Sequence, residues 1–378
     1  MTGPTEASSG RADPGRQRFL FLQAYDGGSH RAFLDAVLRH SRHDWSVLRR
    51  PAMHWKWRMR SAALGLADEA DRWMSDHGAP DAVLCTDMLD VPAWSGLVRD
   101  PRWQAVPIVT YFHENQWMYP VAPGARVDSH YGYTNLLSAI ASDGCFFNSD
   151  FHREAFLRES ELFVNGMPDS ASDHDFESLR RKSSTVYPGF EPAERQGADH
   201  RRAGPLRIGW VSRWEHDKRP DRFASLLNRL ADRGMEFQLI LLGPRPRRSC
   251  ENLESIRNRH PRRIVHDGFA DADNYQKWIH SIDVVVSTAD HEFFGIAVCE
   301  AISAGAVPVL PNRLSYPELV STPTLYDDLD QAADLIVGLD DDEVRYAYRA
   351  IARKDVQRFR CGDTIRSLDS CLTKIVVG

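Results

Sequence analysis

Two glutamates eight positions apart form the most distinctive spacing of chemistry-bearing residues in the chain. Glu292 and Glu300 lie in the run ADHEFFGIAVCEAISAG, which follows Asp283–Ser287, an apolar segment typical of a buried strand. A helix beginning near Phe293 would present unpaired N–H groups to a phosphate or a sugar, and Gly295 would let the backbone approach that ligand closely. Glu300 would lie roughly 8–10 Å further along the axis, which suits a sugar and a ribose at the two ends of a diphosphate. The alternative is an amphipathic helix with two solvated glutamates.

Two cations follow another expected strand in the same half of the chain. Arg213 and Lys218 are five residues apart in the run GWVSRWEHDKRP, directly after the apolar segment Leu206–Val211. At the carboxyl end of a strand, such a pair could bind a diphosphate and stabilise the charge that it gains on leaving. The alternative is a pair of surface charges that flank a turn.

Two polar segments follow expected strands in the first half of the chain. The run Gly27-Gly28-Ser29-His30 comes after Phe19–Leu22, and paired glycines before a helix can host an anion, although this is neither G-x-G-x-x-G nor a Walker loop. The run His113-Glu114-Asn115-Gln116 comes after Pro107–Tyr111. It is not the zinc motif H-E-x-x-H, because position 117 is Trp. Four polar side chains after a buried strand are unusual for packing, so the run indicates either a site or a polar turn.

A basic segment with interleaved aromatic residues is a candidate RNA contact. The segment 49–60 carries five Lys and Arg residues and no acid, and it includes Trp55 and Trp57. Cations for phosphates beside rings for stacking are how proteins bind unpaired nucleotides. The alternative is a solvated helix start with its tryptophans in the core. A second basic cluster is a weaker candidate for RNA contact and comprises Arg245, Arg247, Arg248, Arg262 and Arg263.

The composition excludes several classes of protein. The chain has 378 residues, enough for two domains, a net charge of −6 and no apolar run near the ~18 residues of a membrane span. A membrane-spanning protein and a polybasic nucleic-acid coat are therefore excluded. The six cysteines form no C-x-x-C pair and the fifteen histidines form no ligand-spaced set, so we expect free thiols and no metal site. The N-terminal residues lack the apolar core of a secretory signal, and we expect a cytoplasmic protein.

The order of the expected elements favours an α/β fold of two doubly wound domains that face a cleft. Short apolar runs alternate with helical patterns, which means parallel sheets wrapped by helices, with ligands at the carboxyl ends of the strands. Further strands are expected at 46–48, 82–85, 144–148, 237–242, 264–266 and 306–310. Residues 160–202 break this rhythm and are expected to form loops and a linker. The predicted units are a disordered leader (1–17), an N-terminal acceptor domain (18–195), a C-terminal nucleotide-sugar domain (203–350) and a final helix (351–378) that packs back on the first domain.

These motifs together resemble a known family. The loop and helix with Glu292 and Glu300 resemble the E-x7-E signature of retaining glycosyltransferases with the GT-B fold, and Arg213 and Lys218 match the diphosphate-binding pair of that group. The first half is more specific, because four of its runs resemble the tRNA-queuosine alpha-mannosyltransferase family: YDGGSH (25–30), HWKWR (54–58), YFHENQ (111–116) and YGYTN (131–135). The resemblance extends from about Phe19 to Leu325.

The resemblance implies transfer of mannose from GDP-mannose to the cyclopentenediol of queuosine at the wobble position of tRNA-Asp. Net retention follows from an α-linked donor and product, with the leaving diphosphate taking the acceptor proton and no metal required. It implies catalytic roles for His113, Glu292, Arg213 and Lys218. It implies donor binding by Gly27, Gly28, Ser29, Arg213, Lys218, His291, Glu292, Phe293, Phe294, Gly295 and Glu300. It implies acceptor or tRNA binding by His30, His54, Trp55, Lys56, Trp57, Arg58, Asp87, Glu114, Asn115 and Gln116.

Two alternatives remain open. One is a retaining GT-B transferase that acts on a lipid, a polysaccharide or a small molecule, which the tryptophans at 55 and 57 would also suit. The other is a silent nucleotide-sugar binder or tRNA adaptor, whose mark would be the loss of Glu292, Arg213 or Lys218, and all three are present. No obligate protein partner and no membrane association are predicted.

Overall fold

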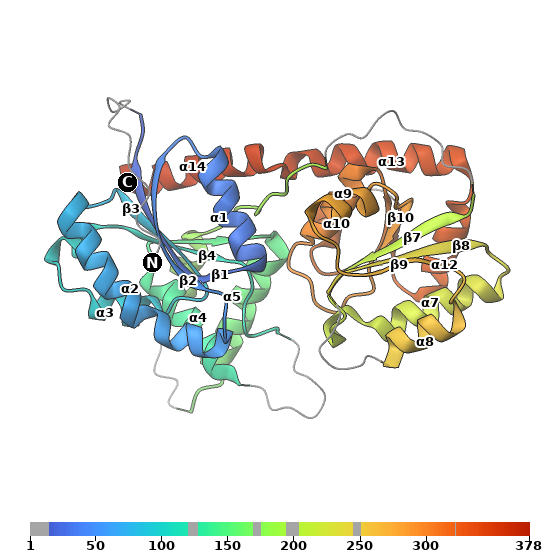
Figure 1. Cartoon of the computed structure of the whole chain (residues 1–378). Helices are drawn as coiled ribbons and strands as arrows, with labels where there is room; N and C mark the ends of the chain where they lie inside the picture. Colours follow the sequence, from blue (N-terminus) through green and yellow to red (C-terminus); the bar gives the residue numbers. More distant parts are fainter. Residues whose placement is uncertain (1–14, 120–127, 169–174, 194–203, 245–250, 322) are drawn as a thin grey trace.

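Two parallel sheets, each of six strands in the part of the chain that the structure describes, divide the protein into two α/β halves (Figure 1). The computed structural model describes residues 15–119, 128–168, 175–193, 204–244, 251–321 and 323–378. The strand orders are β2-β1-β3-β4-β5-β6 and β12-β11-β10-β7-β8-β9, so each sheet reverses its direction of growth beside its first strand. This is the doubly wound arrangement that the alternating pattern predicted.

The N-terminal half contains the first six strands and six helices among its described residues. Its strands are β1 (Arg18–Asp26), β2 (Asp44–Pro51), β3 (Ala82–Thr86), β4 (Ile108–Phe112), β5 (Gly144–Phe147) and β6 (Ser183–Thr185). Its helices are α1 (Gly28–His40), α2 (Trp55–His77), α3 (Val91–Leu97), α4 (Ser129–Ala141), α5 (Asp150–Asn165) and α6 (Phe176–Arg181), with a 3-10 turn at Pro101–Ala105. The centre of β1 and all of β3 are buried, as a parallel sheet covered on both faces requires.

The C-terminal half repeats this arrangement. Its strands are β7 (Leu206–Val211), β8 (Phe237–Leu242), β9 (Ile264–Gly268), β10 (Val284–Val286), β11 (Val307–Pro311) and β12 (Leu325–Tyr326). Its helices are α7 (Pro220–Asp232), α8 (Glu251–Arg259), α9 (Ala272–Ile279), α10 (Ile296–Ala304), α11 (Tyr316–Leu319), α12 (Leu329–Gly338) and α13 (Asp342–Val356). Short 3-10 turns occupy His216–Lys218 and Gln357–Phe359.

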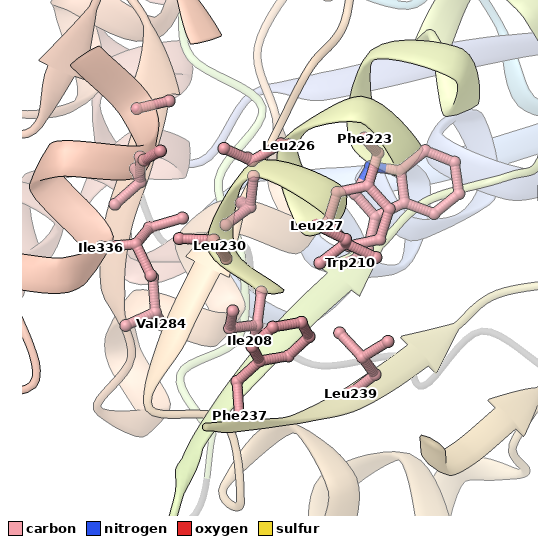
Figure 2. Packing of buried hydrophobic residues seen from close by; sticks show 14 of the residues in the cluster. Ile208, Trp210, Phe223, Leu226, Leu227, Leu230, Phe237, Leu239, Val284 and Ile336 are labelled. Carbon is pink, nitrogen blue, oxygen red and sulfur yellow. The ribbon is translucent and has the colours of Figure 1, made fainter. Parts of the chain in front are cut away.

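Helix α7 shows how the sequence periodicity builds the core of the C-terminal half (Figure 2). Phe223, Leu226, Leu227 and Leu230 recur at helical spacing and are fully buried against the sheet. The Phe223 ring stacks on that of Trp210 from β7, with centroids 5.3 Å apart. Burial of each such side chain contributes roughly 1.5–3 kcal/mol, so this helix holds the strand that carries Arg213 at its end.

The end of the chain returns to the N-terminal half. Helices α13 and α14 (Cys361–Val377) run along one side of both halves (Figure 1). Ile365, Leu368 and Leu372 of α14 are fully buried in the cluster that includes Phe21 and Phe33. The predicted boundary at residue 350 falls inside α13, and the helix that covers the N-terminal sheet is α14.

Several sequence expectations require correction. The stretch expected to be loops and linker holds the end of α5, the short helix α6 and strand β6, although its residues 169–174 and 194–202 lie outside the described ones. Strand β6 is a three-residue polar edge strand, so it lacks an apolar signal. Most of the expected disordered leader also lies outside the described residues, but Arg16 forms an ion pair with Asp44 of β2. The α10 helix begins at Ile296 rather than near Phe293.

The described cysteines are free thiols, as predicted. Four of them are buried and Cys371 is partly buried, whereas Cys250 lies outside the described residues. In the described ranges no helix is both long and apolar enough to cross a membrane.

Candidate active site

A cleft of about 500 Å³ lies between the two halves, at the carboxyl ends of their strands. It brings together expected site residues from both halves. From the N-terminal half they are Gly27, Gly28, Ser29, His30, Trp55, His113 and Glu114. From the C-terminal half they are Arg213, Lys218, His291, Glu292, Phe293, Phe294 and Gly295. Residues nearly 270 positions apart in the sequence therefore face one cavity.

The loop between β10 and α10 forms the C-terminal wall of the cleft. Gly295 caps α10 with a φ of +99°, a left-handed conformation that favours glycine, and it has no side chain to accept from the first-turn amides. Ile296 and Ala297, the first two residues of the helix, line the cleft. The wall thus presents the N–H end of a helix, where the dipole favours a negatively charged group.

Lys218 joins this loop to the end of the 3-10 turn that follows β7. Its Nζ donates to the carbonyl of His291 at 2.7 Å and to Glu292 Oε2 at 3.2 Å, and it lies 3.4 Å from Asp217 Oδ2. Burial alone would lower the pKa of Lys218, but the charges of Glu292 and Asp217 outweigh it and raise the pKa above its ordinary value. Burial opposes ionisation of Glu292, yet the charge and hydrogen bond of Lys218 hold its pKa below the ordinary value. The pair is therefore ionised at neutral pH.

Arg213 lies beside this pair and remains half-exposed. Its guanidinium donates to Glu215 Oε1 at 3.2 Å, and its side chain lines the cleft. Because Arg213 and Lys218 border the same cavity as the N-terminus of α10, two cations and a helix end converge on one space. Such a convergence suits a diphosphate.

Buried histidines form the opposite wall. The rings of His30 and His113 lie 4.1 Å apart. Burial lowers the pKa of His30 to about 3, and burial followed by the nearby charges of His30 and His152 lowers that of His113 well below its ordinary value. Among the described atoms, His30 Nδ1, His113 Nε2 and His291 Nε2 are buried without a hydrogen-bond partner. All three residues line the cleft, His30 and His113 from the N-terminal half and His291 from the β10–α10 loop opposite them.

Direct contacts hold the two halves together near the cleft. Glu318 of α11 accepts hydrogen bonds from the backbone N–H groups of Asp150 and Phe151, at 2.9 and 2.6 Å, and so caps the N-terminus of α5 across the boundary. In the same first turn of α5, the His152 ring stacks on that of Phe293 in the β10–α10 loop, with centroids 4.0 Å apart. Helix α5 thereby fixes the position of that loop relative to the N-terminal sheet.

Some expected site residues lie elsewhere. Glu300 does not line the cleft, and its carboxylate accepts a hydrogen bond from the hydroxyl of Tyr275 at 2.5 Å. Asp87 is only 1% exposed and accepts from the backbone N–H of His113, so it supports the loop from below. Asn115 and Gln116 are buried and are absent from the cleft lining.

The expected RNA-binding residues lie at the N-terminus of α2. Trp57 is 67% exposed, whereas Trp55 is half-buried and lines the cleft. Lys56 Nζ lies 5.5 Å from the Trp55 ring centroid and 5.7 Å from that of Tyr131. Cations and aromatic rings thus occupy the surface at the cleft mouth. The exposed His54 precedes the helix with a φ of +46°, and Arg58 follows one turn later, half-buried.

The second basic cluster is partly accounted for. Arg245, Arg247 and Arg248 lie outside the described residues. Arg263 donates to the Met235 carbonyl and lies over the Phe237 ring, so it has a structural role in its own half.

The sequence motifs did not indicate several cleft residues. Tyr119 lines the cleft from the N-terminal half, and its ring lies 5.4 Å from that of His291. Asn148 lines it at the end of β5 and donates to the carbonyl of His113 at 2.7 Å. Asn148 is the last residue of the expected strand 144–148, and the observed strand ends one residue earlier, so its place at the carboxyl end of a strand was the available signal.

Comparisons with known proteins agree with this geometry. A family model described as tRNA-queuosine alpha-mannosyltransferase N-terminal matches residues 18–190, and one described as Glycosyl transferases group 1 matches residues 205–342. The tRNA-queuosine alpha-mannosyltransferase of Drosophila melanogaster is 33% identical over 321 residues, which cover 82% of this chain and 84% of the relative.

Solved structures share the fold at low identity. Anabaena Alr3699/HepE, in complex with UDP and glucose, superposes with a TM-score of 0.65 at 16% identity and covers 95% of this chain and 100% of its own. The sucrose-phosphate synthase of Thermosynechococcus elongatus gives 0.68 at 13% identity, with 96% and 100% covered. The fold is therefore GT-B.

Proposed function

Because this chain belongs to the tRNA-queuosine alpha-mannosyltransferase family and is a glycosyltransferase of the GT-B fold, we propose that it transfers mannose from GDP-mannose to the cyclopentenediol of queuosine at the wobble position of tRNA-Asp. The observation that carries the proposal is the cleft itself. One wall has two cations and a helix N-terminus for a diphosphate, and the other wall opens onto the basic and aromatic start of α2.

The donor diphosphate lies between Arg213, Lys218 and the N-terminus of α10 in this proposal. As the bond between the sugar C1 and the phosphate oxygen breaks, negative charge grows on the β-phosphate of GDP. Arg213 and Lys218 neutralise that charge without reorganisation, because the contacts with His291 and Glu292 already hold Lys218 in place.

The acceptor hydroxyl attacks the same face of the sugar, so the α-configuration is retained. A new bond forms between C1 and the acceptor oxygen, and the hydroxyl proton moves to the departing phosphate oxygen. His113 and His291 line the cleft with neutral rings and contact the sugar from the two halves. The proposal contains no metal ion, because protein cations neutralise the leaving group.

The RNA docks on the N-terminal half, at the start of α2. Lys56 and Arg60 bind phosphates there, and the exposed ring of Trp57 offers a stacking surface. Because Trp55 lines the cleft one residue away from this surface, a nucleotide inserted into the cleft remains connected to an RNA chain that lies on α2. We expect the reaction to take place in the cytoplasm.

Incubation with two tRNAs and two donors tests the proposal. The purified protein is given GDP-mannose or UDP-glucose, with tRNA-Asp that contains queuosine or with the same tRNA lacking it, and the nucleosides are separated and weighed by mass spectrometry. We expect one hexose on queuosine from GDP-mannose alone. Equal labelling of both tRNAs would refute queuosine as acceptor, and transfer from UDP-glucose at a similar rate would refute the donor.

A further inference from the structure

Glu114 is a carboxylate of the N-terminal half that lines the cleft and, among the described residues, has no ion-pair partner. It lines the cleft from the loop after β4, and no Lys, Arg or His forms an ion pair with it in the described part of the chain. Building on the proposed function, we propose that Glu114 binds the vicinal diol of the acceptor ring, with its carboxylate oxygens accepting hydrogen bonds from both hydroxyls, and thereby selects an acceptor that carries this diol.

The other carboxylates near the cleft are committed to different partners. Asp87 is buried below the wall, and its Oδ1 accepts from the backbone N–H of His113. Glu292 is held by Lys218 at 3.2 Å on the donor side. Of the described carboxylates in the N-terminal half, Glu114 is therefore the one available at the cleft to bind hydroxyls of an acceptor.

The position of Glu114 fits the geometry of transfer. Arg213 and Lys218 of the opposite half line the same cavity as Glu114, and their charges lower its pKa, so the carboxyl group and the two cations border one space. Trp55 lines the same cavity from the start of α2, where the RNA is proposed to dock. A hydroxyl bound at Glu114 therefore lies between the RNA surface and the donor.

The chemistry of a carboxylate matches a vicinal diol. An ionised carboxylate offers two acceptor oxygens and no donor, so it can accept from two neighbouring hydroxyls at once. An amide lacks the charge and the second acceptor oxygen, so its hydrogen bonds to the two hydroxyls are weaker. Gln116 Nε2 donates only a long, weak hydrogen bond of 3.5 Å to Glu114 Oε1.

The surroundings make diol binding sensitive to pH. Burial raises the pKa of Glu114 to about 7, while Arg213 and Lys218 lower it and two acids of the opposite half raise it. The titratable or charged groups that act on Glu114 or adjoin it are Arg213, Glu215, Asp217, Lys218, Tyr119, His113 and Asp87. Since the ionised form binds the diol, affinity for the acceptor should rise between pH 6 and pH 8.

The first experiment measures kinetics of Glu114→Gln. With queuosine-containing tRNA we expect KM for the tRNA to rise roughly 10- to 100-fold, the range for losing hydrogen bonds to a charged group. We expect KM for GDP-mannose to stay within about twofold and the rise in tRNA affinity from pH 6 to pH 8 to disappear. Glu177→Gln, which changes an exposed glutamate of α6, is the matched control and should behave as the wild type.

The second experiment measures binding with a tRNA that carries the same modified base with only an aminomethyl arm. Wild type should bind this diol-free tRNA more weakly than the queuosine form, and Glu114→Gln should bind both equally. Equal weakening of both tRNAs by the substitution, or no discrimination by the wild type, would overturn the role of Glu114. Failure of the wild type to transfer mannose would refute the proposed function instead, because the binding comparison does not depend on transfer. Circular dichroism confirms that the variant is folded.

Discussion

Lys218→Ala is the substitution that most directly separates catalysis from RNA binding. The Nζ of Lys218 lies 2.7 Å from the His291 carbonyl and 3.2 Å from Glu292 Oε2, and its side chain is 11% exposed. Removing it takes away a cation beside the site proposed for the diphosphate and a contact that fixes the β10–α10 loop. Both losses fall on the donor side of the cleft.

The magnitude follows from the two roles. Loss of one preorganised charge-stabilising group costs about 2.7–4 kcal/mol in the transition state, which is a fall of about 10²–10³ in kcat. Leaving the charge of Glu292 unpaired adds about 3–5 kcal/mol of destabilisation, which is at or below the lower end of the ~5–15 kcal/mol of a typical folded protein. The variant should therefore fold and lose turnover.

The assay combines single-turnover transfer with tRNA binding by fluorescence anisotropy. We expect kcat to fall at least about 100-fold, while the dissociation constant for tRNA stays within about twofold. Lys277→Ala, an exposed lysine of α9 in the same half, is the control and should leave both quantities unchanged. If Lys218→Ala abolished RNA binding, or if turnover survived, the division of roles between the two halves would be wrong.

Three further outcomes follow from the same structure. Because burial lowers the pKa of His30 and His113, the folded state binds fewer protons than the unfolded one. The contribution of these histidines to stability is therefore complete above a pH of about 6.5 and is lost as the pH falls below it. The midpoint of thermal unfolding should be lower at pH 5.5 than at pH 7.5, and an unchanged midpoint would contradict this. Glu318→Ala removes the acceptor of two N–H groups of α5, so we expect the free energy of unfolding to fall by about 1 kcal/mol in chemical denaturation. KM for GDP-mannose should rise a few-fold in a donor titration, and an unchanged KM would show that this contact does not affect the site. Lys56→Ala should weaken tRNA binding and leave donor affinity unchanged. The slope of the tRNA binding constant against salt concentration should fall by about one released counterion, and an unchanged slope would place the RNA elsewhere.

The sequence was informative where burial on both faces of a sheet requires continuous apolar residues. The bounds predicted for Leu206–Val211 and Phe237–Leu242 match β7 and β8. The polar edge strand Ser183–Thr185 was not predicted, because it buries few apolar side chains and is defined by its pairing with β5. The pattern of apolar residues therefore predicts which strands are buried, but it does not predict which strands pair with each other.

The positions of the site residues at the ends of strands could be predicted from the sequence, but the orientations of their side chains could not. Residues placed after strands, such as Arg213 and Glu114, do line the cleft. Asp87 and Glu300 occupy equally plausible positions in the sequence, yet one is buried under the wall and the other accepts from Tyr275. The direction of a polar side chain depends on its contacts with residues distant in the sequence. The local spacing of residues does not predict those contacts.

A structure of the protein with bound GDP-mannose would show whether the cleft between the two halves holds the donor. We expect both phosphates to lie within hydrogen-bond distance of Arg213, Lys218 and the first amides of α10, with mannose against His113 and His291. A diphosphate bound outside the space between these two walls would contradict this expectation.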